Sequence, residues 1–267
     1  MLNVTLIGLG AIGSAVAQGL AHRNDIRFVA VILPGSRLGV PRPALSGLAY
    51  TPAVVSRFAD APPADLVVEC AGHGAIEDHV LPALSAGVPC VVTSIGALAT
   101  PGLPERLEAA ARMGHTRLEL LSGAVGAIDA LAAARLGGLD EVVYTGRKPP
   151  AAWLGTPAQQ VRDLESLTEA MVIFEGSARE AASAYPKNAN VAATLALAGV
   201  GFEQTRVRLI ADPGASGNVH HVRARGAFGE FEITLNGRPL AANPRTSALT
   251  VYSAMRAIVN RATAIAI

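Results

Sequence analysis

A glycine-rich segment near the start of the chain has the residue types and spacing of a dinucleotide-binding turn. An apolar run enters Gly8, Gly10 and Gly13, spaced as G-x-G-x-x-G, and a helical pattern follows. In such turns the first glycine permits a tight turn, the second lets a pyrophosphate approach the backbone, and the third lets the helix pack closely against the strand. The N–H groups at the helix start, around Ala11 and Ile12, favour negative charge because the helix dipole is positive there. The segment therefore predicts a site for the pyrophosphate of NAD or NADP.

The end of the second predicted strand bears on the choice between these two cofactors. NAD-selective domains carry an acidic residue about 20 positions after the glycines, where it binds the ribose 2′-hydroxyl. This chain has Pro34, Ser36 and Arg37 in that region and no acidic residue. Because a guanidinium matches phosphate oxygens, Ser36 and Arg37 are candidates for a 2′-phosphate, although Arg37 is equally compatible with a solvated loop position. We therefore expect NAD and NADP both to be accepted.

The carboxyl end of a predicted parallel strand provides further candidate contacts. Cys70, Ala71 and Gly72 lie there, and ligands bind at such strand ends in open α/β sheets. We expect these three residues to line the cofactor site, and His73, which follows them, is a candidate for the same place.

Of the six histidines, His220 and His221 are adjacent in a strand-like segment. Alternation along a strand places His220 and Val222 on one face, and His221 and Arg223 on the other. The two imidazoles therefore do not share one role. The spacing alone leaves open whether His220 is a catalytic residue or a buried structural histidine.

A polar segment containing Pro186, Lys187, Asn188 and Asn190 precedes an alanine-rich helical pattern. These residue types are typical of a capped helix start. They also place amide groups and one ammonium where a dicarboxylate or a nicotinamide amide can bind. Both interpretations stay open at this point.

The order of the expected elements indicates an α/β protein with two kinds of sheet. In the first half, strands at 2–9, 26–33, 65–70, 88–93 and 117–121 alternate with helices at 12–22, 75–86 and 103–113. In the second half, strands at 141–147, 170–175, 205–211, 218–225 and 230–235 dominate, with helices at 128–136, 177–184, 189–200 and 246–261. Strand–helix alternation produces a parallel sheet with right-handed crossovers.

We therefore expect a Rossmann domain with a doubly wound parallel sheet over residues 1–122. A smaller mixed α/β substrate domain is expected over residues 123–242. Residues 243–267 are expected to form a C-terminal helix that begins after Asn243-Pro244 and packs back on the first domain.

The composition excludes several classes of protein. The net charge is +1 without a basic run, which argues against a nucleic acid partner, and no apolar run reaches the roughly 18 residues of a membrane span. Cys70 and Cys90 lie in apolar runs without C-x-x-C spacing, and the N-terminus lacks the basic stretch of a signal peptide. These features indicate reduced thiols and a cytoplasmic protein. Hydrophobic residues make up 51% of the chain and charged residues 16%, which favours a subunit interface and hence a homo-oligomer.

Taken together, these segments resemble the L-aspartate dehydrogenase family, from one end of the chain to the other. The segments that carry the resemblance are Gly8-Leu9-Gly10-Ala11-Ile12-Gly13, Glu69-Cys70-Ala71-Gly72, Ser94-Ile95-Gly96-Ala97-Leu98, Ser122-Gly123-Ala124-Val125-Gly126-Ala127-Ile128-Asp129, Tyr185-Pro186-Lys187-Asn188-Ala189-Asn190-Val191 and Gly217-Asn218-Val219-His220. The last three are more specific than the glycine spacing. The resemblance implies that Ala124 and Asn190 contact the nicotinamide cofactor and that His220 is the catalytic histidine.

The resemblance also implies a reaction. L-aspartate, NAD(P)⁺ and water would give oxaloacetate, ammonia and NAD(P)H through iminoaspartate, a chemistry linked to NAD biosynthesis. The protein must hold the substrate Cα close to the cofactor and remove a proton, for which an imidazole is suited near neutral pH. For the two substrate carboxylates, Lys187 with Asn188 is the first candidate, and Arg147, Lys148 and Arg223 are weaker ones.

Two other functions remain as alternatives. A dihydrodipicolinate-reductase-like enzyme shares the two-domain plan and a His-His pair, but this chain has no lysine shortly after His220-His221 and no Asp-Ala-Pro-Ser-Gly run. A non-catalytic nucleotide-sensing protein is also compatible with a Rossmann half, because the fold does not determine the function.

Overall fold

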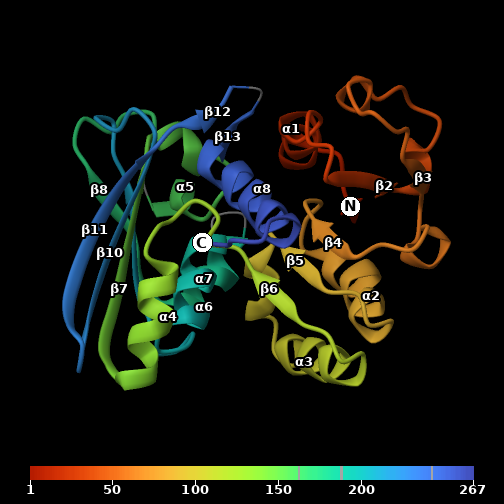
Figure 1. Cartoon of the computed structure of the whole chain (residues 1–267). Coiled ribbons are helices and arrows are strands. Elements are labelled where there is room, and N and C mark those ends of the chain that lie inside the picture. Colours follow the sequence, from red (N-terminus) through yellow and green to blue (C-terminus); the bar gives the residue numbers. More distant parts are fainter. Residues whose placement is uncertain (162, 187–188, 242) are drawn as a thin grey trace. The chain divides into compact units, whose positions relative to one another are not determined.

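A computed structural model describes residues 1–161, 163–186, 189–241 and 243–267, and the chain divides into two units (Figure 1). The first unit comprises Met1–Leu121 and Thr250–Ile267, and the second comprises Ser122–Leu249. Residues 243–249, expected to belong with the C-terminal helix, thus lie in the second unit.

The first unit is built on a six-stranded sheet in the order β3-β2-β1-β4-β5-β6, with every neighbouring pair parallel. The strands are β1 (Leu2–Ile7), β2 (Ile26–Ile32), β3 (Ala53–Val55), β4 (Leu66–Glu69), β5 (Cys90–Val92) and β6 (Leu118–Leu120). The strand order reverses between β1 and β4, and ligands bind at such a switch point in doubly wound sheets. The expected Rossmann architecture is confirmed.

The helices of this unit follow the expected alternation. They are α1 (Ala11–Gly19), a π-helical turn (Ile76–Val80) continued by α2 (Leu81–Ser85), α3 (Leu103–Met113) and α8 (Ala248–Ala262). The central strands β4 and β5 are buried along their whole length, as expected of parallel strands that are covered on both faces. Helix α8 packs against α1, where a Cβ at Gly19 would stand 2.6 Å from the Met255 side chain.

The second unit contains a five-stranded mixed sheet in the order β11-β10-β7-β9-β8. Its strands are β7 (Leu139–Lys148), β8 (Met171–Ser177), β9 (Arg206–Ala211), β10 (Asn218–Gly226) and β11 (Gly229–Gly237). Only the β7–β9 pair is parallel among these described pairings. Strands β10 and β11 form the expected hairpin, with Gly226 opposite Gly229.

Helices cover one face of this mixed sheet. They are α4 (Ile128–Gly137), α5 (Ala158–Val161), α6 (Ala178–Ala184) and α7 (Asn190–Ala198). Figure 1 shows α4, α6 and α7 on the same side of β7, β10 and β11. A short ribbon of β12 (Pro239–Leu240) and β13 (Asn243–Ser247) precedes α8. Helix α8 therefore begins at Ala248, two residues after the expected start at position 246, and residues 243–247, grouped with the C-terminal helix in the expected division, form a strand.

No helix in the described part of the chain is both long and apolar enough to cross a membrane.

Candidate active site

The glycine turn between β1 and α1 has a different constraint at each glycine. Gly8 has φ +89°, and a Cβ there would stand 2.7 Å from the Ala71 Cα atom. A Cβ at Gly13 would stand 2.2 Å from the Gly8 backbone oxygen. Nothing lies within 4 Å of the place that a Cβ at Gly10 would occupy. Gly8 and Gly13 are thus required by packing, whereas Gly10 faces open space.

The N-terminus of α1 is free of side-chain caps. Gly10 is its N-cap residue, no side chain caps the helix, and the first turn carries no acidic residue. The backbone N–H groups around Ala11 and Ile12 therefore have no acidic side chain from their own helical turn beside them. This arrangement fits an anionic pyrophosphate, both by hydrogen bonding and by the helix dipole.

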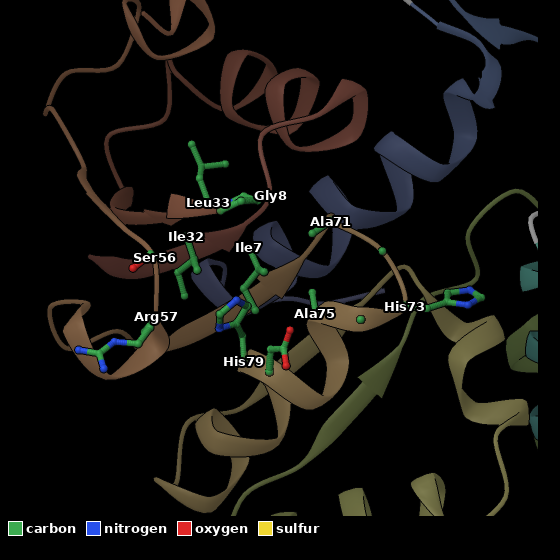
Figure 2. Close-up of a pocket in the computed structure, with 14 residues that line it drawn as sticks. Ile7, Gly8, Ile32, Leu33, Ser56, Arg57, Ala71, His73, Ala75 and His79 are labelled. Atoms are coloured by element: carbon green, nitrogen blue, oxygen red, sulfur yellow. The ribbon is translucent and has the colours of Figure 1, made fainter. Parts of the chain in front are cut away.

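A cavity of about 680 Å³ lies beside this turn, at the ends of β1, β2 and β4 (Figure 2). It is lined by Ile7, Gly8, Ile32, Leu33, Pro34, Ser56, Arg57, Ala71, Gly72, His73, Gly74, Ala75, Asp78 and His79. Ala71, Gly72 and His73, which are expected near the cofactor, therefore line this cavity. Cys70 is not among the lining residues: it is buried beneath the turn, and its Cβ is 3.6 Å from where a Cβ of Gly13 would be.

Sequence reasoning did not identify Ser56 and Arg57. They follow β3, in a proline-rich region without clear periodicity. Figure 2 shows them across the cavity from the loop that runs from Ala71 to His73. Arg57 is held by a double hydrogen bond to Asp60, at 2.8 Å for each contact.

Glu69 is a second residue whose role the sequence did not reveal. Its side chain is fully buried at the end of β4. Oε1 accepts hydrogen bonds from the N–H groups of Ala71 (2.7 Å) and Gly72 (2.8 Å) and from the Ser94 hydroxyl (2.9 Å). Oε2 accepts from the N–H groups of Thr93 (3.3 Å) and Ser94 (3.0 Å). One carboxylate thus ties together the loops that follow β4 and β5.

Ser36 and Arg37 lie in an exposed 3₁₀ turn after β2. Arg37 lines a smaller cavity of about 130 Å³ together with Ser14 and Arg42. The Arg42 guanidinium donates to the backbone oxygen of Leu38 at 2.7 Å and also to that of Arg37. No acidic residue lines this cavity among the residues that the structure describes, so its charged groups are two guanidiniums.

In the second unit, His220 lies on the buried, helix-covered face of β10. It is 3% exposed, and its Nδ1 atom is 2.9 Å from the hydroxyl of Tyr144 on the neighbouring strand β7. Its Nε2 atom is buried and has no hydrogen-bond partner within the described part of the chain. Burial, and next the positive charge of Lys148, lower the pKa of His220 to about 4. The imidazole is therefore neutral near pH 7 and able to accept a proton.

Lys148, at the end of β7, shares this face, because side chains alternate along a strand and Tyr144 and Gly146 precede it at every second position. It is half-buried, and its ammonium lies 5.3 Å from the centre of the fully buried Trp153 ring. Desolvation lowers the pKa of Lys148 to about 8. A cation on the same face as the imidazole suits an anionic substrate.

The opposite face of the sheet carries the remaining candidates in ion pairs. The His221 imidazole contacts Glu232. Two guanidiniums are paired at 2.8 Å, that of Arg147 with Asp212 and that of Arg223 with Glu141. Arg147 and Arg223 are thus already engaged by carboxylates, and they do not share the face of His220.

Two family-implied cofactor contacts also lie in the second unit. Ala124 is half-buried in the turn that leads to α4, and Asn190 is the exposed first residue of α7, with its backbone oxygen accepting the Thr194 hydroxyl at 2.8 Å. Lys187 and Asn188, the candidates for substrate binding, lie outside the described residues.

Both units match families of known proteins. A family profile described as "Homoserine dehydrogenase, NAD binding domain" matches residues 8–121, and one described as "Aspartate dehydrogenase, C-terminal" matches residues 129–261. The L-aspartate dehydrogenases of Cupriavidus taiwanensis and Pseudomonas aeruginosa are each 61% identical over 267 residues, covering 100% of both chains. The crystal structure of aspartate dehydrogenase from Thermotoga maritima aligns with a TM-score of 0.78 and 29% identity, covering 100% of this chain and 99% of that one. The resemblance seen in the sequence is thus confirmed, and the chain belongs to the L-aspartate dehydrogenase family.

Proposed function

We propose that this chain catalyses the NAD(P)-dependent oxidation of L-aspartate to oxaloacetate and ammonia through iminoaspartate, with His220 as the group that transfers protons. The observation that carries the proposal is the buried, neutral His220, whose Nε2 has no partner in the described part of the chain, together with the glycine turn at the start of α1. Family membership supplies the substrate, because the relatives at 61% identity are L-aspartate dehydrogenases.

The first unit provides the cofactor site in this proposal. The backbone of Gly10, Ala11 and Ile12 would hold the pyrophosphate, and a bound nicotinamide cofactor would supply the hydride acceptor. Ala71 and Gly72 border the cavity, with their N–H groups fixed by Glu69. Cys70 supports this loop from beneath.

Five further residues are assigned to the cofactor. Ser36 and Arg37, with Arg42, are assigned to a 2′-phosphate, which is supported by Arg37 and Arg42 lining one small cavity, so NADP is accepted alongside NAD. In the second unit, Ala124 and Asn190 contact the nicotinamide cofactor, as the family resemblance implies.

Proton transfer is the task of the second unit. L-aspartate reacts as the free amine, so one proton must leave its ammonium before a hydride leaves Cα, and the attack of water on the imine releases another. An imidazole that is neutral near pH 7 accepts such a proton at Nε2 and returns it to solvent or product, which contributes roughly 10²–10⁴-fold to the rate.

The two substrate carboxylates need cationic or amide partners. Lys187 and Asn188 remain the candidates named from the sequence, and Lys148 joins them because it shares the face of His220. A carboxylate bound to Lys148 would offset the positive charge that lowers the pKa of His220.

The proposal extends to organisation and location. Residues 1–121 with the C-terminal helix act as the cofactor domain, and residues 122–249 act as the substrate domain. The high apolar content supports a homo-oligomer, and the two buried free cysteines support a reducing, cytoplasmic compartment. Consumption of L-aspartate through its imine is consistent with a link to NAD biosynthesis.

The test is to incubate the protein with L-aspartate and either NAD⁺ or NADP⁺, and to follow both the absorbance of the reduced cofactor and the release of ammonia. Equal amounts of both products are expected. Cofactor binding without reduction would support a nucleotide-sensing role instead. Oxidation of NADPH only with dihydrodipicolinate would support the reductase alternative.

A further inference from the structure

We propose that Tyr144 is the positioning residue of His220. Its hydroxyl is hydrogen-bonded to Nδ1, and Nε2 is therefore the nitrogen that exchanges protons with the substrate. The inference rests on the proposed function of His220. It goes beyond that function because it assigns a role to a residue on a different strand, and a role to each ring nitrogen.

The two side chains form a fixed pair on one face of the mixed sheet. Tyr144 is 2% exposed and His220 is 3% exposed, and the hydroxyl oxygen lies 2.9 Å from Nδ1. The rings are stacked, with 6.0 Å between their centres and 18° between their planes. His220 lies directly opposite Gly146 on β7, and Tyr144 lies two residues further along the same face. The pair is therefore a diagonal cross-strand contact, within the reach of an aromatic side chain.

Gly146 makes this contact possible. A Cβ at this position would stand 2.7 Å from the Tyr144 hydroxyl oxygen and 3.2 Å from the Leu209 side chain. The residue opposite His220 thus has no side chain, and the phenol leans over its backbone to reach Nδ1. Any other residue at 146 would displace the hydroxyl from that place.

A phenol hydroxyl suits this task in both protonation states of the imidazole. In the neutral tautomer that can accept a proton at Nε2, Nδ1 carries the hydrogen and donates it to the hydroxyl oxygen, and Nδ1–H donates in the same way when the ring is protonated. Burial raises the pKa of Tyr144, so the hydroxyl keeps its proton across the neutral range. The contact at Nδ1 therefore persists through the catalytic cycle, and Nε2 is left for the substrate. Nε2 is buried without a partner among the described residues, which is costly, and a polar substrate group would supply that partner.

Tyr144→Phe tests this role because it keeps the ring and the stacking but removes the hydroxyl. We expect kcat to fall about 10–100-fold, which is the effect of removing the orienting partner of a working histidine. The KM for L-aspartate and the Kd for NAD(P) should stay within about twofold, because the hydroxyl touches neither ligand. Gly146→Ala should reproduce the loss of kcat by displacing the same hydroxyl.

Tyr185→Phe is the matched control. Tyr185 lies in the same unit, is 3% exposed, and donates its hydroxyl to the backbone oxygen of Ile173 at 3.2 Å. Its substitution also removes one buried phenol hydroxyl, but one that bonds to Ile173 and not to the imidazole, so kcat should stay close to that of the wild type. A kcat for Tyr144→Phe equal to that of Tyr185→Phe would overturn the proposal.

Nitrogen-15 NMR of labelled histidine provides a readout that does not need turnover. The Nδ1 resonance of His220, assigned by its absence in His220→Gln, should shift in Tyr144→Phe and not in Tyr185→Phe. An unchanged Nδ1 resonance in Tyr144→Phe would show that the hydroxyl does not hold the imidazole. The NMR result stands even if the wild type fails to oxidise L-aspartate, so failure of this inference and failure of the proposed function are distinguishable.

Discussion

Gly13 packs directly against Gly8: a Cβ added to Gly13 would stand 2.2 Å from the Gly8 backbone oxygen. The helix after the turn therefore lies on its own strand with no space for a side chain between them. Gly10, between the two, meets nothing within 4 Å. Packing thus explains two glycines of the motif, whereas the third is explained by a ligand that approaches the backbone.

The first prediction contrasts Gly10→Val with Gly13→Ala. Gly10 has φ −78°, which valine adopts, so Gly10→Val should fold and should lose affinity for NAD(P) because its side chain occupies the approach path. Gly13→Ala should instead lower the free energy of unfolding by about 1–3 kcal/mol through overpacking. Urea unfolding and cofactor titration separate the two effects. Unchanged cofactor affinity in Gly10→Val would contradict the assigned site.

The second prediction concerns the buried carboxylate of Glu69. Glu69→Gln places an NH₂ group against N–H donors whichever way the amide is turned, because both carboxylate oxygens accept from N–H groups. We expect unfolding to become easier by about 2–3 kcal/mol, and cofactor affinity to fall as the loop of Ala71 and Gly72 loosens. The control is Glu77→Gln, since exposed Glu77 pairs only with Arg106 on the surface among its described contacts and should change stability by less than about 1 kcal/mol. Equal effects of the two substitutions would show that Glu69 does not hold the loops after β4 and β5 together.

Much of the fold follows from local sequence patterns. The helix Leu103–Met113 has the bounds expected from its periodicity, and the buried strands of the first unit are recognisable as short apolar runs between turn residues. The strand Asn243–Ser247 is not predictable in this way, because its partner has only two residues, Pro239–Leu240, and so leaves no local pattern.

Only part of the candidate site can be predicted from the sequence. Strand alternation correctly separated the faces of His220 and His221, since that relation is local. Tyr144 and Glu69 had no comparable signal, because their partners are distant in the chain: Tyr144 is 76 residues from His220, and Glu69 is 25 residues from Ser94. Only the pairing of strands brings such residues together.

The third prediction concerns nucleotide choice. Arg37→Ala and Arg42→Ala should each lower the preference for NADP relative to NAD, by about tenfold, because each removes a guanidinium from the small cavity beside β2. The kcat/KM values for both cofactors measure this ratio. Arg23→Ala is the control, since Arg23 is paired with Asp25 and does not line that cavity. A ratio unmoved by either substitution would remove these residues from the 2′-phosphate site.

The fourth prediction concerns stability against pH. The pKa of His220 is lowered to about 4 by burial and then by Lys148, whereas an unfolded histidine titrates near 6.5. Between these values the unfolded chain binds a proton that the folded chain does not, so stability falls as the pH drops from 6.5 to 4, by up to about 3 kcal/mol.

His220→Gln removes this contribution, and the difference between the two unfolding curves isolates it. The only tryptophan, Trp153, is fully buried in the second unit, and its fluorescence reports unfolding there. Parallel pH dependence in the wild type and in His220→Gln would show that His220 does not titrate as described.

The central claim is that His220, and not its neighbour, transfers protons in the oxidation of L-aspartate. The most direct measurement compares kcat for His220→Ala and His221→Ala, with NAD(P) affinity measured in both. His220→Ala should lower kcat by roughly 10²–10⁴-fold while cofactor binding is retained. His221→Ala should lose far less, because His221 lies on the opposite face against Glu232. A loss in His221→Ala as large as that in His220→Ala, or near-normal turnover in His220→Ala, would contradict this account.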